Sequence, residues 1–240
     1  MDELRKGFHH ELGQIRDEAA ELINIVIDAI PRATRVLLES DLDSADALIR
    51  ADEVLNARSL ELEEQCYRML ALQAPVASDL RQVVAIVKII SEIERSGDLA
   101  VNICKAARRI YGHTLNKDLQ QVITQMGEQA TQLFQAALEA FSESDAAKAA
   151  AIDDMDSYLD GLQRQFIRVI LESHAEGSIN VQVAIQLAVV ARFLERIGDH
   201  AVNISERVRY FVTGWLPENQ TNPRTNSSED DTDGIPFIQE

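Results

Sequence analysis

The sequence predicts an all-α fold made of two tandem, pseudo-repeated three-helix bundles of long antiparallel helices. Of the 240 residues, 46% are hydrophobic but only 5% are aromatic, and there are only 10 glycines and 5 prolines. Sandwiches and barrels use more aromatic and β-branched residues and more Gly/Pro turns, so this composition excludes an all-β fold. Apolar residues instead recur at three- and four-residue spacings along most of the chain, which is the period of an α-helix.

Turn-forming residues divide the chain into six expected helices. Their ranges are 3–39, 44–72, 75–110, 116–141, 145–174 and 178–212. Pro31 should kink or split the first helix, because proline lacks the N–H donor that a helix interior uses. Ser44 is expected to cap the second helix, and Pro75 suits the first turn of the third. Gly177 separates the last two helices and Gly214 ends the sixth. A helix of ~35 residues is about 52 Å long, which predicts elongated bundles.

The chain also repeats itself. Residues 94–103 read ERSGDLAVNI and residues 195–204 read ERIGDHAVNI, so eight of ten positions are identical at an offset of 101 residues. Upstream, ADEVLN at 51–56 corresponds more weakly to IDDMD at 152–156. Helices one to three and four to six are therefore expected to be two copies of one unit.

The repeat and the change in composition near the C-terminus predict the domain organisation. We expect a first three-helix bundle over 1–112, a second over 113–213 and a disordered acidic tail over 214–240. Trp215, the only tryptophan, is expected to pack on the end of the second bundle. The apolar run IPFI at 235–238 is a candidate docking motif within the tail.

Charge and cysteine usage restrict the function. Lys and Arg number 23 against 40 acidic residues, a net charge of −17. Nucleic-acid binding relies on basic surfaces, so we expect no nucleic-acid partner. The chain shows no signal peptide and no apolar run of ~20 residues, which predicts a cytoplasmic protein with no direct membrane insertion. Cys66 and Cys104 lie in apolar helical patterns and are expected to be buried free thiols.

Paired carboxylates are the most specific chemical feature. Glu94 and Asp98 lie four residues apart, and Glu195 and Asp199 repeat the arrangement in the second copy. This spacing places both members of a pair on one helix face, where like charges destabilise an isolated helix by ~0.2–0.5 kcal/mol. Apolar residues at helical spacing fall in line with both pairs, so we expect the acids to continue an apolar seam. Burial there requires a partner, which is an arginine, a proton or a metal.

Two interpretations of these acids compete. In one, Arg95, Arg196 or a neighbouring helix forms salt bridges with them, while Gly97 and Gly198 allow close helix approach. In the other, they bind a metal, because carboxylate and amide oxygens suit hard cations such as Mg, Ca, Mn or iron. The second helix of each unit adds candidate ligands. The predicted metal set is Glu94, Asp98, Glu195, Asp199, Asp52, Asn56, Asp153 and Asp156.

The sequence offers no catalytic residue. None of the five histidines has a Glu three residues before it, which argues against the di-iron sites of helical bundles. His200 follows Asp199 but is expected to point to a different face and to be a spectator. P-loop, GxSxG and GxGxxG patterns are missing. We therefore predict that the protein is not an enzyme; a carboxylate-bridged metalloenzyme and a purely structural helical scaffold are the alternatives.

The doubled ERxGDxAVNI motif, the LQAPVASDLR segment at 72–81 and the two tandem three-helix units together resemble the PhoU family. Members of that family regulate phosphate transport and phosphate signalling in bacteria and archaea. The resemblance covers about residues 1–213, and the family's (E/D)xxxD motif occurs once per repeat. The second copy lacks the PVASDLR segment, and the tail beyond Gly214 is not explained by the family pattern.

This resemblance implies a non-enzymatic cytoplasmic regulator that dampens the phosphate-starvation response. The implied partners are the ATPase subunit of the phosphate ABC transporter, a membrane sensor histidine kinase and a second copy of the chain in a homodimer. Some members bind multinuclear iron or zinc clusters at the motif, and others are described with magnesium or manganese. By position, Glu94, Asp98, Glu195 and Asp199 inherit that metal-binding role.

Overall fold

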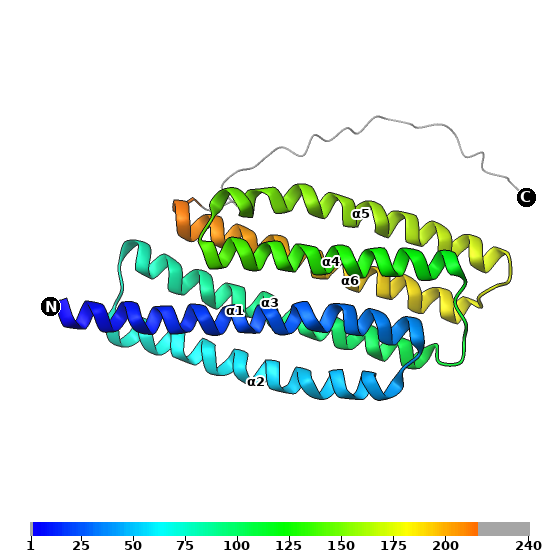
Figure 1. Ribbon diagram of the computed structural model, residues 1–240, viewed down its shortest axis with the longest axis horizontal. Coiled ribbons are helices and arrows are strands. Elements are labelled where there is room, and N and C mark those ends of the chain that lie inside the picture. Colours follow the sequence, from blue (N-terminus) through cyan, green and yellow to red (C-terminus); the bar gives the residue numbers. More distant parts are fainter. Residues whose placement is uncertain (1, 216–240) are drawn as a thin grey trace, which may run out of the picture.

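The computed structural model describes residues 2–215 and folds them into six long helices without a strand (Figure 1). The helices are α1 Asp2–Glu39, α2 Leu42–Gln73, α3 Ala77–Arg109, α4 Lys117–Glu143, α5 Ala146–Ala175 and α6 Val181–Thr213. The all-α class is confirmed. The predicted tail lies outside the described residues, except for its first two.

Side-chain caps fix the starts of four helices. Asp41 caps α2, because its carboxylate accepts a hydrogen bond from the backbone N–H of Ser44 at 3.0 Å. The prediction that Ser44 is the cap was wrong, since Ser44 supplies one of the helix's unpaired N–H groups. Asn116, Asp145 and Asn180 cap α4, α5 and α6 in the same way.

Pro31 and Pro75 occupy different places relative to their helices. Pro31 lies inside α1, which continues past it, so of the predicted kink or split the split does not occur. Pro75 lies outside α3, which begins at Ala77 after the extended residue Val76. Ala74, the C-cap residue of α2 directly before the proline, takes a left-handed conformation with φ of 43°. This turn ends α2 before the proline is reached.

The two bundles lie side by side with their helices along the long axis of the molecule (Figure 1). The first bundle contains α1–α3 and the second contains α4–α6, and they meet where α1 packs on α4 and α3 packs on α6. Buried side chains from both bundles form one continuous apolar core. Among the six helices within residues 2–215, none combines the length and the apolar character needed to cross a membrane.

Arg16 joins the bundles at the C-terminal end of α4. Its guanidinium donates to the carbonyl oxygen of Phe141 at 3.0 Å and to the hydroxyl of Ser144 at 2.8 Å. The same group lies over the rings of Phe141 and Phe211, with 5.4 and 5.6 Å to the centroids. The contact therefore satisfies a carbonyl at a helix end and adds a cation–π interaction.

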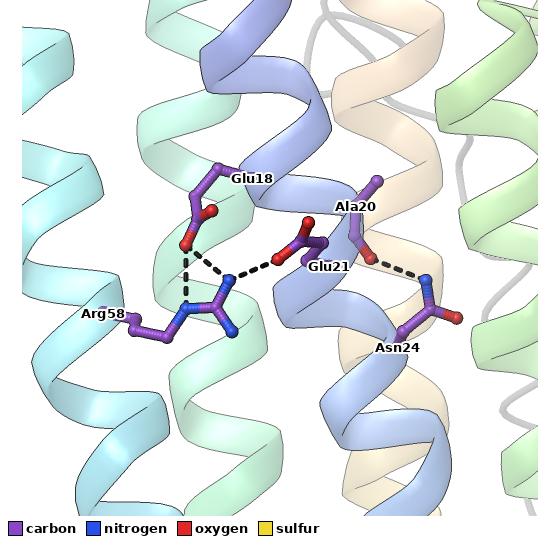
Figure 2. A network of polar contacts seen from close by, with 5 residues as sticks. All are labelled: Glu18, Ala20, Glu21, Asn24 and Arg58. Atoms are coloured by element: carbon purple, nitrogen blue, oxygen red, sulfur yellow. Dashed lines mark hydrogen bonds and ion pairs between the residues drawn. The ribbon is translucent and has the colours of Figure 1, made fainter.

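Figure 2 shows an ion-pair network between α2 and α1. Arg58 donates from Nε to Glu18 at 2.8 Å and from Nη2 to Glu21 at 2.6 Å. Nearby, the side-chain amide of Asn24 donates to the carbonyl oxygen of Ala20 within α1 at 3.1 Å. The charged groups are partly exposed, so such pairs contribute about 1 kcal/mol or less each. They orient α1 against α2, whereas the apolar core supplies most of the stability.

The second and third helices of the two repeat units align at different sequence offsets. Gly198 follows Gly97 by 101 residues in the third helix of each unit. In the second helix, however, the buried leucine that packs on this glycine is Leu55 in α2 and Leu159 in α5, an offset of 104 residues. The structural counterpart of Asp52 is therefore Asp156, and not a residue 101 positions later.

Both motif glycines mark places where helices approach closely. A Cβ on Gly97 would lie 2.7 Å from Oδ1 of Asp52, and one on Gly198 would lie 2.6 Å from Oδ1 of Asp156. Leucine methyl carbons at 2.4 and 2.6 Å complete the two contacts. The expectation that these glycines allow close helix approach is confirmed.

We expect Gly198→Ala to lower the free energy of unfolding by ~1–3 kcal/mol, because the added methyl group overpacks the α5–α6 contact. Gly161→Ala is the matched control, since a Cβ there meets nothing within 4 Å. That control should be stabilising by about 0.5–1 kcal/mol, because alanine loses less backbone entropy in a helix. Urea unfolding measures both changes. Equal effects of the two substitutions would contradict the close-approach role of Gly198.

Candidate metal centre

In the first bundle, α2 and α3 supply the candidate ligands. Asp52 is half-buried on α2, and the side-chain amide of Asn56 donates to its Oδ2 at 3.2 Å. The Oδ1 atoms of both residues are buried without a hydrogen-bond partner. Burial raises the pKa of Asp52, and the charges of Asp98 and Glu94 add to the shift. The structure thus brings these four residues into one electrostatic cluster.

In the second bundle, α5 and α6 form the equivalent cluster. Oδ1 of Asp156 is buried without a partner, and burial raises the pKa of Asp156 to about 6, helped by the charges of Asp160 and Asp199. Glu195 is only 8% exposed. One of its oxygens pairs with Arg192, while Oε2 is buried without a partner. Burial also raises the pKa of both Glu195 and Asp199.

The two clusters differ in exposure and charge. Glu94 and Asp98 are exposed, so the expected apolar seam was wrong for the first copy, whereas in the second copy Glu195 is buried and Asp199 is half-buried. The ammonium of Lys105 also favours the charged form of the first cluster. Where the first cluster has the neutral Asn56, the 104-residue offset places Asp160 in the second. The second cluster therefore holds more negative charge in less solvent.

Asp153 and Asp160 show where the sequence-based ligand set and the structure differ. Asp153 is exposed on α5 and acts on Asp156 only through its charge. Asp160 was missed, although it is half-buried and contributes to the raised pKa of Asp156. The buried leucines of the second helix in each unit, Leu55 and Leu159, are 104 residues apart. Aligning the two units by that offset would have placed Asp160 opposite Asn56.

Arginine side chains pair with only some of the acids in the two clusters. Arg192 pairs with Glu195, an interaction one turn along α6 that the sequence interpretation did not include. Arg95 pairs instead with Glu92, at 3.6 Å. The buried oxygens on α2 and α5 gain no partner from these contacts.

His200 points to a different face of α6 from Asp199, as expected, and has a partner there. It is buried on α6, and its Nδ1 lies 2.6 Å from Oε2 of Glu92 on α3. The side-chain amide of Asn203 donates to the same oxygen at 3.0 Å. This polar contact crosses from one bundle to the other beside both acidic motifs. No sequence signal indicated it, because the partners lie more than 100 residues apart and the first-copy counterpart of His200 is Leu99.

The donor chemistry fits a hard cation. Within residues 2–215, no three His, Cys, Asp or Glu side chains are gathered into a geometry that would hold a metal ion. The unpartnered buried oxygens of Asp52, Asn56, Asp156 and Glu195 are nevertheless groups that a cation satisfies. In the first cluster both of these donors lie on α2, whereas in the second cluster one comes from α5 and one from α6.

The fold and the duplicated motif define a tandem helical-bundle protein with one acidic cluster per repeat. The PhoU domain model matches the chain twice, over residues 19–107 and 123–208. The chain belongs to the PhoU family.

Curated relatives and solved structures are similar along nearly their whole length. "Phosphate-specific transport system accessory protein PhoU homolog 1" of Mycobacterium leprae is 34% identical over 221 residues, covering 92% of this chain and 99% of the relative. The Mycobacterium tuberculosis homolog 2 is 34% identical over 215 residues, covering 89% and 100%. Crystal structures of PhoU from Pseudomonas aeruginosa and of the phosphate transport system regulatory protein PhoU from Streptococcus pneumoniae superpose with TM-scores of 0.81 and 0.80. Each is 29% identical and covers 87% of this chain, and 100% and 98% of the respective structures.

We expect Asp156→Asn to stabilise the chelator-treated protein at pH 7 by about 1 kcal/mol, a value reduced for partial exposure. The folded protein keeps the Asp156 proton up to about pH 6, whereas an unfolded Asp ionises near 3.9. The contribution of Asp156 to the free energy of unfolding is therefore fully present below about pH 4, and it is lost as the pH rises through about 6.

The amide should therefore raise the urea midpoint at pH 7 and change it little at pH 4. Asp153→Asn, on the exposed side of α5, is the control and should shift the free energy of unfolding by less than about 0.5 kcal/mol at either pH. An equal gain from Asp156→Asn at both pH values would rule out ionisation as the cause.

Proposed function

We propose that this chain is a cytoplasmic, non-enzymatic regulator of phosphate transport and of the phosphate-starvation response. The support is the family membership together with similarity over nearly the full length of relatives named as accessory or regulatory proteins of phosphate transport. The six helices are long and expose two bundle surfaces, which suits a protein that acts by contacting others (Figure 1). A regulator of this kind requires docking surfaces and no nucleophile.

The finer proposal is a metal-binding adaptor between the ATPase subunit of the phosphate ABC transporter and its sensor histidine kinase. The observation that carries the metal part is the set of buried oxygens without partners, which occurs in both clusters at the same helix contact. A buried carboxylate oxygen costs free energy until a proton, a donor or a cation satisfies it. Because the candidate ligands are all oxygens, magnesium, manganese and iron fit better than zinc.

A cation at these clusters would act on helix packing. It would neutralise the acids of α2 and α3, or of α5 and α6, and so relieve the burial and the like-charge repulsion that raise the pKa values of Asp52 and Asp156. It can change the surface shown to a partner only as far as it binds two arrangements of the helices with different affinity. The second cluster is more buried and more acidic, so we expect it to bind a cation more tightly than the first.

The metal content of the purified protein tests directly whether each acidic cluster binds a metal ion. In protein purified without an affinity tag, we expect Glu94→Ala/Asp98→Ala and Glu195→Ala/Asp199→Ala each to lower the bound metal to about half of the wild-type value, because each removes one of two oxygen-donor sites. Elemental analysis with protein quantification gives the ratio. Asp153→Ala/Asp154→Ala, which removes two exposed acids from α5, is the control and should keep the wild-type content. Absence of metal from every sample would overturn the metal proposal and leave the family assignment intact.

A reporter assay of the phosphate-starvation response tests the proposed adaptor role. With ample phosphate, Asp98→Ala combined with Asp199→Ala should raise a phosphate-starvation reporter about tenfold or more, because the cation can no longer bias the helix packing that represses the kinase. The control is again Asp153→Ala/Asp154→Ala, compared at matched protein levels. Full repression by the Asp98/Asp199 variant would show that any metal is structural and has no part in signalling.

A further inference from the structure

One end of the molecule, formed by the α2–α3 turn and the C-terminal end of α6, carries an exposed apolar surface. The three most exposed large apolar side chains in the described part of the chain lie at this end: Leu72 at 78%, Val76 at 73% and Trp215 at 72%. The expected packing of Trp215 on the second bundle was therefore wrong. A Cβ on Gly214 would lie 3.6 Å from Cζ of Arg81, which places the end of α6 against the first turns of α3 (Figure 1).

Two adjoining grooves hollow this surface. One has a volume of about 300 Å³ and includes Arg68 and Leu72 in its lining. The other has a volume of about 400 Å³ and includes Arg5 and Val76. Gln73 lines both, so the two grooves are neighbours at the end of α2. Together they offer apolar contacts flanked by guanidinium groups.

Arginine side chains lie at the grooves of a protein whose net charge is −17. Arg5 and Arg68 line the grooves, and Arg81 lies beside Gly214 at the same end with its Nε buried without a hydrogen-bond partner. The acids in the lining are Asp79 and Glu11, and the carboxylate of Glu11 already accepts a hydrogen bond at 2.8 Å. An acidic segment with apolar residues beside it would complement this surface.

The chain itself contains such a segment. Residues 216–240 hold six acids and one base, and the acidic run EDDTD at 229–233 is followed by IPFI at 235–238. The family model ends at residue 208, so this segment has no counterpart in it. We propose that residues 229–238 dock on this end of the same molecule. The apolar side chains of 235–238 cover Leu72 and Val76, and the acids of 229–233 face the three arginines.

The length of the segment favours this end over the other. Twenty residues separate Trp215 from position 235, and a chain of that length has an r.m.s. span of about 25 Å. The repeat places a related apolar surface at the opposite end of α6, where Val181 and Ile185 are exposed. That surface lies a full 33-residue helix away, which is about 50 Å. It therefore provides a matched control surface.

Cross-linking in the full chain tests the proposal. We would compare Val76→Cys/Gln239→Cys with Val181→Cys/Gln239→Cys, using a short bis-maleimide, so that the apolar residues 235–238 stay intact. The native Cys66 and Cys104 are buried, and burial raises their pKa values to about 12 and about 11, so they do not compete for the reagent. Leu72→Cys/Gln239→Cys is a second probe of the same groove at an equally exposed position.

Docking predicts intrachain cross-links about tenfold faster at positions 72 and 76 than at 181, because docking raises the local concentration of the segment. Replacing the four acids at 229–233 by their amides, or Arg5→Gln with Arg68→Gln, should lower the rate at position 76 about fivefold and leave the rate at 181 unchanged. If the cross-linking rate at position 76 is the same in both charge-neutralised variants as in the unmodified background, the segment reaches position 76 only by random motion of the connecting chain. That result would overturn the proposal. Products that join two chains would overturn it in favour of a second copy on this surface.

Discussion

The close approach of neighbouring helices at Gly97 and Gly198 is the constraint on which the two clusters depend. Without a Cβ, the α3 and α6 backbones come near enough to α2 and α5 that the carboxylates of Asp52 and Asp156 lie against them. Those oxygens leave water without gaining a donor, so the fold carries a cost at both places. A proton relieves the cost at low pH. At neutral pH the proposed cation would relieve it, which would connect helix packing to ligand binding.

Duplication gave the two halves the same architecture but different chemistry. The acids on α3 are exposed and Lys105 acts on Asp52 beside them, whereas Glu195 on α6 is buried, Asp199 is half-buried, and α5 adds Asp160 to their cluster. The contact between the bundles is also unequal. Glu92 meets His200 across it, but the positions equivalent by the 101-residue offset are Phe193 and Leu99, which are apolar. A polar contact on one side and apolar residues on the other remove the equivalence of the two bundles, so the clusters need not respond alike.

The helical period and the turn residues predicted the fold well, because both depend on interactions between residues that are close in the sequence. The helical period and the glycines between segments define six helices, and a spacing of four residues places Glu195 with Asp199. Spacing does not reveal which face a neighbouring helix covers, so the exposure of Glu94 was not predictable. Asp160 was hidden by the change of register between the second and third helices. The partner of His200 was hidden because only tertiary packing brings it near Glu92.

α6 links these features, because consecutive residues on a helix point in directions about 100° apart. Asp199 belongs to the acidic cluster shared with α5, and the next residue, His200, contacts Glu92 of the other bundle. A cation that draws α6 toward α5 would therefore also displace His200 from Glu92. On the proposed function, a change in charge at the cluster would reach the bundle interface through one continuous helix. The required displacement would be small, since a hydrogen bond of 2.6 Å weakens steeply with distance and angle. Regulation by this route would need no unfolding of α6.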